Sequence, residues 1–232
     1  MIGEKLIARE TEVLRVLRTI GSERPYALIG GYAVDAYSAL PRYSVDLDIV
    51  IARPELEQMA SILKQNGFGK GEPYVNEIEG VETRIFTKPI GDDNVSVDML
   101  VDGIRCRQTE AVWKVDEVSK TVKVQRVIGV NDSVPAKVAS RELLIALKLH
   151  SGRDPDLRDV VMLTADADWA AVLSLANRGS KPKVKDQLEH ELKTLIEPDF
   201  ENRLKTYFGS RQNESNLVNT AAARIRDLLN KI

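Results

Sequence analysis

Two aspartates separated by a single residue, Asp46 and Asp48, have the clearest chemical potential in this sequence. They lie in the run VDLDIVI, where they alternate with apolar residues and so predict a β-strand. Side chains at positions i and i+2 of a strand project from the same face, so the two carboxylates should stand side by side. Because neighbouring like charges repel, the pair needs a compensating cation. Oxygen ligands suit Mg²⁺ best, with Mn²⁺ as the alternative ion.

A pair of glycines, Gly30 and Gly31, supplies a second chemical feature before this strand. The pair follows an apolar run and precedes a short stretch with helical character, residues 32–39. Backbone N–H groups at glycine are unobstructed by a side chain, and the start of a helix favours anions. A Gly-Gly pair alone is usually a turn, and an Asp-x-Asp pair alone usually faces solvent. Together, a phosphate cradle and metal-binding carboxylates indicate chemistry on a nucleoside triphosphate.

Four polar residues fall at every second position of one run, namely Arg42, Ser44, Asp46 and Asp48. With the preceding glycine pair and the intervening helix, the segment resembles the nucleotidyltransferase superfamily, in particular its AbiEii-type, toxin-like members. The resemblance implies an α+β fold, with a short mixed sheet flanked by helices and a helical part that closes over the nucleotide. It also implies that Asp46 and Asp48 bind the metal, and that the nucleotide contacts include Gly30, Gly31, Arg42 and Ser44.

A third acidic residue is implied by the resemblance on a neighbouring strand, and the run VSVDMLV provides Asp98. In mid-strand among apolar neighbours, an unpaired charge would be costly, which favours a functional role. The alternative is an edge-strand aspartate that faces water. Asp102, four residues further on, is a rival for the same role. The resemblance implies that Asp98 is both a metal ligand and a catalytic residue.

A second group of polar residues lies in the run LLIALKLHSGRDPDLRDVVML, residues 143–163. Lys148 interrupts an apolar helical run, and on its own such a lysine usually extends its amine to water. The resemblance instead implies that Lys148 binds triphosphate oxygens, that Arg153 assists it, and that Asp159 acts as a further catalytic residue. Met162 departs from the pattern, because AbiEii-type proteins usually carry a second aspartate three residues after the first.

The order of elements along the chain predicts an α/β part followed by a helical part. Apolar periodicity predicts a first helix over residues 4–19 and a strand from Tyr26 to Ile29. Later we expect a helix from Pro54, extended stretches and then a hairpin, and helices almost throughout from about residue 136. The hairpin is placed at Trp113–Val118 and Thr121–Val127. We therefore expect a nucleotidyltransferase core over residues 1–135 and a helical domain over 136–232.

Composition is consistent with an enzyme of the cytoplasm. The chain of 232 residues is 43% hydrophobic and 29% charged, which is typical of a globular protein that can bury a core. A single cysteine, Cys106, excludes an internal disulfide framework, and two histidines argue against a zinc site. We find no apolar run long enough to cross a membrane and no signal-peptide core, so we expect no membrane partner. The net charge of -2 means that nucleic-acid binding would need a local basic patch, such as residues 178–185 or 203–211.

Three functions remain open at this point. The leading one is transfer of a nucleoside monophosphate from an NTP to a hydroxyl of RNA, such as a tRNA end, or of a protein, in a toxin-like protein with an antitoxin partner. The second is modification of a small molecule such as an antibiotic. The third is a non-catalytic nucleotide-binding module, which loss of a metal ligand would support.

Overall fold

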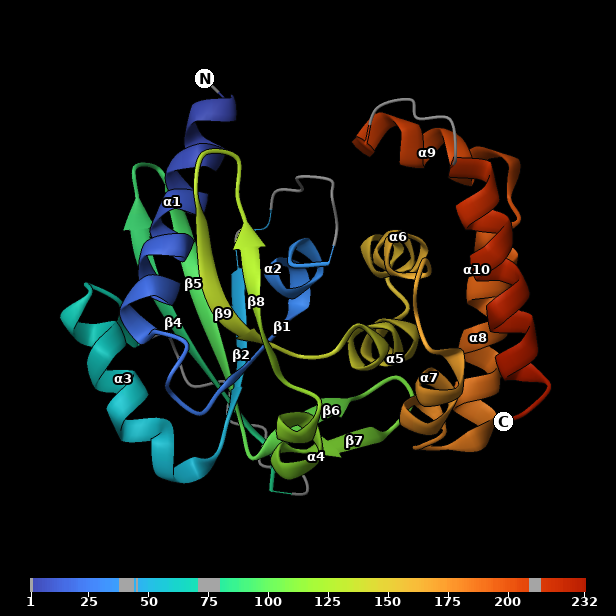
Figure 1. Ribbon diagram of the computed structural model, residues 1–232, viewed down its shortest axis with the longest axis horizontal. Coiled ribbons are helices and arrows are strands. Elements are labelled where there is room, and N and C mark those ends of the chain that lie inside the picture. Colours follow the sequence, from blue (N-terminus) through green and yellow to red (C-terminus); the bar gives the residue numbers. More distant parts are fainter. Residues whose placement is uncertain (1, 38–43, 45, 71–79, 209–213) are drawn as a thin grey trace. The chain divides into compact units, whose positions relative to one another are not determined.

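The computed structural model describes residues 2–37, 44, 46–70, 80–208 and 214–232. The chain divides into two compact units (Figure 1). Unit 1 comprises residues 1–104 and 113–140, and unit 2 comprises residues 105–112 and 141–232. The candidate residues Asp46, Asp48 and Asp98 therefore belong to unit 1, whereas Lys148 and Asp159 belong to unit 2.

Unit 1 is built on a seven-stranded mixed sheet with the strand order β3-β4-β5-β2-β1-β9-β8. The strands are β1 (Ala27–Ile29), β2 (Asp46–Ile51), β3 (Gly69–Lys70), β4 (Glu82–Ile90), β5 (Asp93–Val101), β8 (Lys123–Ile128) and β9 (Ser133–Val138). The central strands β2 and β5 are parallel, and β1 is antiparallel to β2 and parallel to β9. A separate two-stranded sheet contains β6 (Gly103–Cys106) and β7 (Ala111–Lys114).

Along β5, residues that pack in the core alternate with polar residues of the candidate site. Val95, Val97, Met99 and Val101 are all fully buried, while Ser96 and Asp98, between them in the sequence, are half-buried. Because successive side chains of a strand point to opposite faces, one face of β5 packs in the core and the other presents polar groups. The same alternation in β2 buries Leu47 and Ile49 and leaves Asp46 and Asp48 on the polar face.

The helices of unit 1 are α1 (Ile2–Ile20), α2 (Gly30–Asp35), α3 (Leu56–Gln65) and α4 (Val115–Lys120), with a 3-10 turn at Arg53–Glu55 before α3. Helices α1 and α3 lie on the same side of the sheet (Figure 1). The apolar face of α1 includes Val13, Leu14 and Leu17, each at most 1% exposed. Burying such side chains is the main stabilising contribution of this layer.

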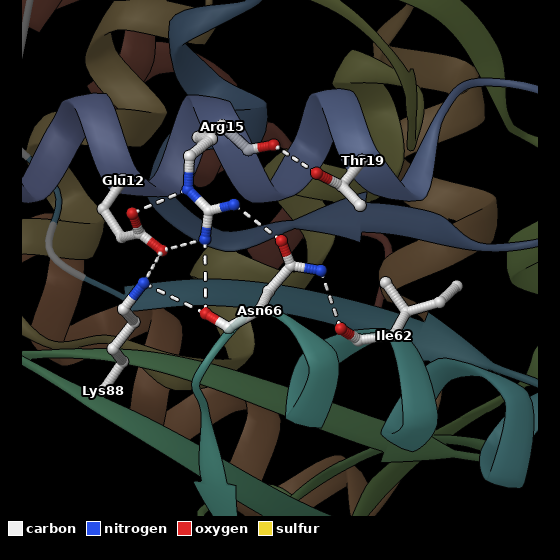
Figure 2. Close-up of polar contacts among 6 residues, drawn as sticks. All are labelled: Glu12, Arg15, Thr19, Ile62, Asn66 and Lys88. Atoms are coloured by element: carbon white, nitrogen blue, oxygen red, sulfur yellow. Dashed lines mark hydrogen bonds and ion pairs between the residues drawn. The ribbon is translucent and has the colours of Figure 1, made fainter.

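A polar cluster joins α1, α3 and β4 beside this apolar layer (Figure 2). Arg15 donates to both carboxylate oxygens of Glu12, at 2.8 and 2.6 Å, and to the side-chain oxygen of Asn66 at 2.6 Å. Lys88 donates to Glu12 and to the carbonyl of Asn66, each at 3.0 Å. Burial opposes ionisation of Glu12, but the hydrogen bonds from Arg15 and Lys88 lower the pKa of this carboxyl below its ordinary value. The cluster therefore fixes α1 to the end of α3 with compensated charges.

Unit 2 is helical apart from the segment 105–112. Its helices are α5 (Arg141–Ser151), α6 (Asp154–Leu163), α7 (Trp169–Ala176), α8 (Lys181–Leu195), α9 (Pro198–Phe208) and α10 (Glu214–Leu229). Helix α5 packs against α6, α7 and α8, and α10 packs against α6, α8 and α9. None of the helices in the described part of the chain is long and apolar enough to cross a membrane.

The α+β fold class is confirmed, with a mixed sheet and a helical C-terminal half, but two local predictions are wrong. The expected hairpin is absent, because residues 115–120 form α4 between β7 and β8. The N–H of Lys114 bonds the Glu117 carboxylate at 3.0 Å, which stabilises the helix start. Helices were expected almost throughout from about residue 136, but residues 133–138 form β9 and the first helix of unit 2 starts at Arg141.

Candidate active site

The strand register brings the three predicted acids of unit 1 to one face of the sheet. Parallel pairing of β2 with β5 places Asp48 opposite Asp98 and Asp46 opposite Ser96. The Ser96 hydroxyl lies 2.8 Å from Oδ1 of Asp46 and 3.1 Å from Oδ1 of Asp98. We call these four residues, Asp46, Asp48, Ser96 and Asp98, the carboxylate face. Ser96 was missed by the sequence analysis, although its position two residues before Asp98 was a usable signal.

Burial and mutual repulsion both oppose negative charge on the carboxylate face. Burial raises the pKa of Asp98, and the nearby charge of Asp46 raises it further, while the hydrogen bond from Ser96 opposes the rise. A carboxyl with a raised pKa is a better proton acceptor than an ordinary one, and a bound cation would lower its pKa.

The rival acid, Asp102, does not lie on this face. It follows β5 in a left-handed conformation, with φ of 66°. Its carboxylate accepts from the backbone N–H of Arg53 at 2.8 Å and from Nε of the same arginine at 2.9 Å. Arg53 also donates to Glu82 at 2.8 Å. Asp102 therefore forms part of an ion-pair network that joins the end of β5 to the start of the α3 region.

Gly30 packs directly against the carboxylate face. Its φ is +69°, a conformation that L side chains rarely adopt, and a Cβ built there would lie 1.9 Å from Oδ2 of Asp48. The preceding Ile29 pairs with Asp48 across β1 and β2. Gly30 is thus needed both for the turn into α2 and for the position of the Asp48 carboxylate.

Replacing Gly30 with alanine should disable the carboxylate face. We expect the turn to be strained and Asp48 to be displaced, because the new Cβ and the carboxylate oxygen cannot occupy the same space. Transfer activity should fall at least about a hundredfold, since small displacements of reacting groups are costly. Gly80 is a control, because it also has a positive φ, +77°, but a Cβ added there would have none of the described atoms within 4 Å. Equal losses in Gly30→Ala and Gly80→Ala would attribute the effect to backbone strain alone.

The remaining predicted residues of this segment lie close to the carboxylate face where the structure describes them. Gly31 is buried in the first turn of α2. Ser44 donates to the carbonyl of Asp46 at 3.4 Å, and its own carbonyl accepts from the Tyr32 hydroxyl at 2.7 Å. Arg42 lies outside the described residues.

The donor chemistry of the carboxylate face fits a magnesium ion. Asp46, Asp48 and Asp98 offer only oxygen ligands, and these are the ligands that Mg²⁺ prefers. Among the described residues, no group of three His, Cys, Asp or Glu side chains is arranged to hold one ion as it stands. Binding would therefore require rotation of carboxylates that the register already places on one face.

In unit 2, Lys148 is buried between two aspartates of α6. Its Nζ lies 2.7 Å from Oδ1 of Asp156 and 2.8 Å from Oδ2 of Asp159, and the Lys148 residue is only 8% exposed. Burial opposes its charge, but Asp159 and Asp156 raise the pKa of Lys148 above its ordinary value. The Lys148 side chain therefore does not extend its amine to water, as a lone lysine in an apolar helix usually does.

Asp156 was missed by the sequence analysis. It accepts hydrogen bonds from the Ser151 hydroxyl and from Nε of Arg153, both at 2.7 Å, in addition to Lys148. Burial opposes its ionisation, but the bond from Arg153 and the charge of Lys148 lower the pKa of Asp156 to about 2. The signal was present, because Asp156 and Asp159 are themselves an Asp-x-x-Asp pair, one turn before the position where Met162 breaks the pattern. We call Lys148, Ser151, Arg153, Asp156 and Asp159 the lysine cluster.

A further buried acid, Glu191 of α8, lies near this cluster. It is fully buried, and burial raises the pKa of its carboxyl well above the ordinary value, to which the charge of Asp156 contributes. Gln187 donates to its Oε1 at 3.2 Å. A Cβ on Gly152 would lie 1.5 Å from the Gln187 amide nitrogen, so any side chain there would displace the Gln187 side chain that bonds Glu191.

His150 and Cys106 form hydrogen bonds that hold the structure of unit 2 together. Nδ1 of His150 lies 2.5 Å from the Thr109 hydroxyl, and Nε2 lies 2.9 Å from the carbonyl of Ala176. Burial lowers the pKa of His150 to about 4, so the imidazole is neutral at pH 7. Cys106 donates to the carbonyl of His150 at 2.9 Å. These contacts tie the segment 105–112 to the helices of unit 2.

Comparisons with known proteins support the fold. The sequence matches no family model, and no curated protein matches it. Among solved structures, JHP933 from Helicobacter pylori aligns over 98% of this chain and 93% of its own, with 14% identity and a TM-score of 0.55. A candidate nucleotidyltransferase from H. pylori aligns over 98% of this chain and 96% of its own, with 14% identity and a TM-score of 0.52. The lincosamide antibiotic adenylyltransferase LnuA, solved with lincomycin, covers 68% of this chain at a TM-score of 0.45, which is too low to support an argument. The chain therefore has a nucleotidyltransferase-like fold.

Proposed function

We propose that this protein is a magnesium-dependent nucleotidyltransferase that moves a nucleoside monophosphate from an NTP to an acceptor hydroxyl. The observation that supports this most strongly is the register of β2 and β5, which sets Asp48 opposite Asp98, with Ser96 bridging Asp46 and Asp98. An aspartate pair on a central strand, a third acid on the adjacent strand and a glycine packed against one of them together suit metal-assisted chemistry on a triphosphate.

In the proposed reaction, the acceptor oxygen forms a bond to the α-phosphorus while the bond to the bridging oxygen of the β-phosphate breaks. Pyrophosphate leaves with that electron pair. Asp98 would help the metal to lower the pKa of the acceptor hydroxyl, whose proton passes to water as the new bond forms. Asp46, Asp48 and Asp98 would hold the metal, which supplies positive charge to the triphosphate and to the attacking and leaving oxygens when bound.

We assign the triphosphate contacts to Gly30, Gly31, Ser44 and Arg42, as the sequence pattern predicts. Contacts from Lys148 and Arg153 remain predictions. The Arg153 side chain is 69% exposed although its Nε bonds Asp156, so its guanidinium is accessible to a phosphate. Lys148 is largely enclosed by Asp156 and Asp159, which suits it to positioning those acids as well as to binding a phosphate.

For the acceptor we propose RNA, such as a tRNA end, with a protein hydroxyl as the alternative, in a protein of the AbiEii type with an antitoxin partner. Lys181, Lys183 and Lys185 on α8 are exposed and are the phosphate contacts that we propose. Lys183 already pairs with Glu110 at 2.6 Å, so Lys181 and Lys185 carry more of this role. Tyr207 and Phe208 lie among the basic residues of 203–211 and are the rings on which we would expect bases to stack, but the structure does not describe their side chains.

The proposal is tested by supplying each labelled NTP in turn with Mg²⁺ and total cellular RNA, followed by separation of RNA, protein and small-molecule fractions. We expect label from one NTP in the RNA fraction, dependent on Mg²⁺ and absent when EDTA is added. Label in the protein or small-molecule fraction would redirect the acceptor assignment. Binding of an NTP without transfer to any fraction would instead support the non-catalytic module.

A further inference from the structure

A small pocket lies between α7 and α10 of unit 2 and shares no residue with the lysine cluster. Its volume is about 230 Å³, and its wall includes Trp169, Leu173, Arg224, Asp227, Leu228 and Lys231. Pockets that enclose whole drug-sized ligands are usually about 300 to 1,000 Å³. This pocket therefore suits a single ring system whose polar substituents remain outside it.

Trp169 provides a rigid aromatic wall. It is the first residue of α7, and the preceding Asp168 caps the helix by accepting from the N–H groups of Ala170 and Ala171 at 2.9 and 3.2 Å. The indole N–H of Trp169 is buried and has no hydrogen-bond partner within the described part of the chain. Buried donors are nearly always paired in native proteins, so this indole N–H is a donor without a partner among the described residues.

The mouth of the pocket carries more positive than negative charge among its described lining residues. Arg224 and Lys231 are exposed, and neither forms an ion pair with another of the described residues. They flank Asp227, also exposed, so the three charged side chains leave one net positive charge. Two cations beside an aromatic wall are the combination that binds a base and its phosphate. The single carboxylate can accept from an exocyclic amine of the base.

We infer that this pocket binds a nucleoside phosphate, with the base against Trp169 and the phosphate at Arg224 and Lys231. The inference stands without the transferase proposal, because it rests only on residues of α7, of α10 and of the turn that follows α10. If the transferase proposal holds, the pocket offers this protein a nucleotide contact that the carboxylate face does not supply. A free nucleotide and a nucleotide of a single-stranded RNA share this chemistry, and the experiment separates the two sources.

The test measures binding of fluorescently labelled AMP and of a labelled oligoadenylate of eight nucleotides, each by anisotropy. All proteins carry Asp48→Asn and all buffers contain EDTA, so that binding at the carboxylate face is suppressed. We expect Trp169→Ala to weaken binding about tenfold, the loss typical of one stacked base. Trp169→Phe should retain most of the affinity, since a ring remains.

The charge contribution is tested with Arg224→Glu combined with Lys231→Glu, which alters exposed side chains and should not impair folding. This variant should also lose about tenfold in affinity and become less sensitive to salt. Arg226→Glu, on α10 but outside the pocket, is the matched control and should bind within twofold of the parent.

Each outcome decides the inference. Trp169-dependent binding of AMP supports a free nucleotide as the ligand, and Trp169-dependent binding of the oligonucleotide alone supports RNA. Absence of binding to both ligands overturns the inference, as does equal binding by the parent, Trp169→Ala and the double charge variant. None of these results depends on transfer activity, so failure here and failure of the transferase proposal are distinguishable.

Discussion

Replacing Asp48 with asparagine should reduce nucleotide transfer about a thousandfold while the protein stays folded. Removing one metal ligand forfeits several kcal/mol of transition-state stabilisation, and each 1.36 kcal/mol corresponds to a factor of ten in rate. Asparagine has the shape of aspartate, so the close packing against Gly30 is kept and only the charge is lost. Transfer of label from the NTP, measured with purified protein, gives the rate.

The melting temperature of the same variant separates chemistry from folding. Asp48 stands opposite Asp98 and beside Asp46, so removal of its charge relieves repulsion when no metal is present. We therefore expect the melting temperature in EDTA to hold or rise. Stabilisation by Mg²⁺, measured as the increase in melting temperature when the ion is added, should shrink in this variant, because the ion stabilises the folded state only as far as it binds there.

Asp102→Asn is the matched control for this prediction. Asp102 pairs with Arg53 and lies off the carboxylate face, so its neutralisation should lower stability more than it lowers transfer. If purified Asp48→Asn transfers nucleotide at the parental rate, the carboxylate face is not the metal site. If Asp102→Asn loses activity while keeping its melting temperature, the assignment of the third acid must move to Asp102.

The first helix and the central strands of unit 1 could be predicted because each left a local signal. Apolar residues at helical spacing marked α1, and alternation of apolar and acidic residues marked β2 and β5. The register between β2 and β5 could not be read from either strand, since pairing depends on contacts across the sheet. Only the paired structure shows that Asp98, and not Asp102, stands opposite Asp48.

The misplaced hairpin shows where local patterns fail. Residues 115–120 combine valines, which favour strands, with acidic and polar residues that suit a helix start. Tertiary contacts decide between the two, because Val118 is fully buried on the inner face of α4 and Glu117 caps the helix at Lys114. An apolar residue every third or fourth position over six residues is too short a sample for periodicity to decide.

The lysine cluster illustrates a different limit. Lys148 and Asp159 were singled out by resemblance, but their mutual contact and the role of Asp156 depend on how α5 packs against α6. Glu191, distant in sequence, left no signal at all, because an exposed and a buried glutamate look alike within a helix. Whether a charged side chain is buried and paired depends on the packed structure. The sequence could therefore indicate Lys148 and Asp159 as candidates, but not which charged residues of the helical half are buried together.

Replacing Lys148 with methionine should destabilise unit 2 strongly, in addition to any effect on NTP binding. Methionine fills much of the space of the lysine stem, but it leaves the Asp156 and Asp159 carboxylates without the ammonium between them. Removing one partner of a buried ion pair typically costs about 3 to 5 kcal/mol, because the remaining charge stays buried. The free energy of unfolding at pH 7, measured by urea denaturation, should fall by about this amount.

The pH dependence of stability provides an independent check of the same contact. The pKa of Asp156 is about 2 in the folded protein, below the value of 3.8 for an ordinary aspartate. A depressed folded-state pKa stabilises the protein above the unfolded-state pKa, and this contribution is lost as the pH falls through the folded-state pKa. The parent should therefore lose about 2 kcal/mol between pH 5 and pH 2 from this group. Lys148→Met should show a smaller loss over the same range, because part of the depression comes from the lysine.

The triple variant Lys148→Met, Asp156→Asn, Asp159→Asn separates the ion pair from packing. With all three charges removed, no buried charge of this ion pair remains uncompensated, so stability should recover a large part of the loss seen in Lys148→Met.

An NTP titration at a temperature where every variant is folded then asks whether Lys148 also contacts the triphosphate. Weak NTP binding by Lys148→Met at full folding would support that contact, since a methionine can replace the stem but not the charge. If Lys148→Met binds NTP with the affinity of the parent, Lys148 only holds Asp156 and Asp159 in place. If Lys148→Met is as stable as the parent, the buried ion pair itself is contradicted.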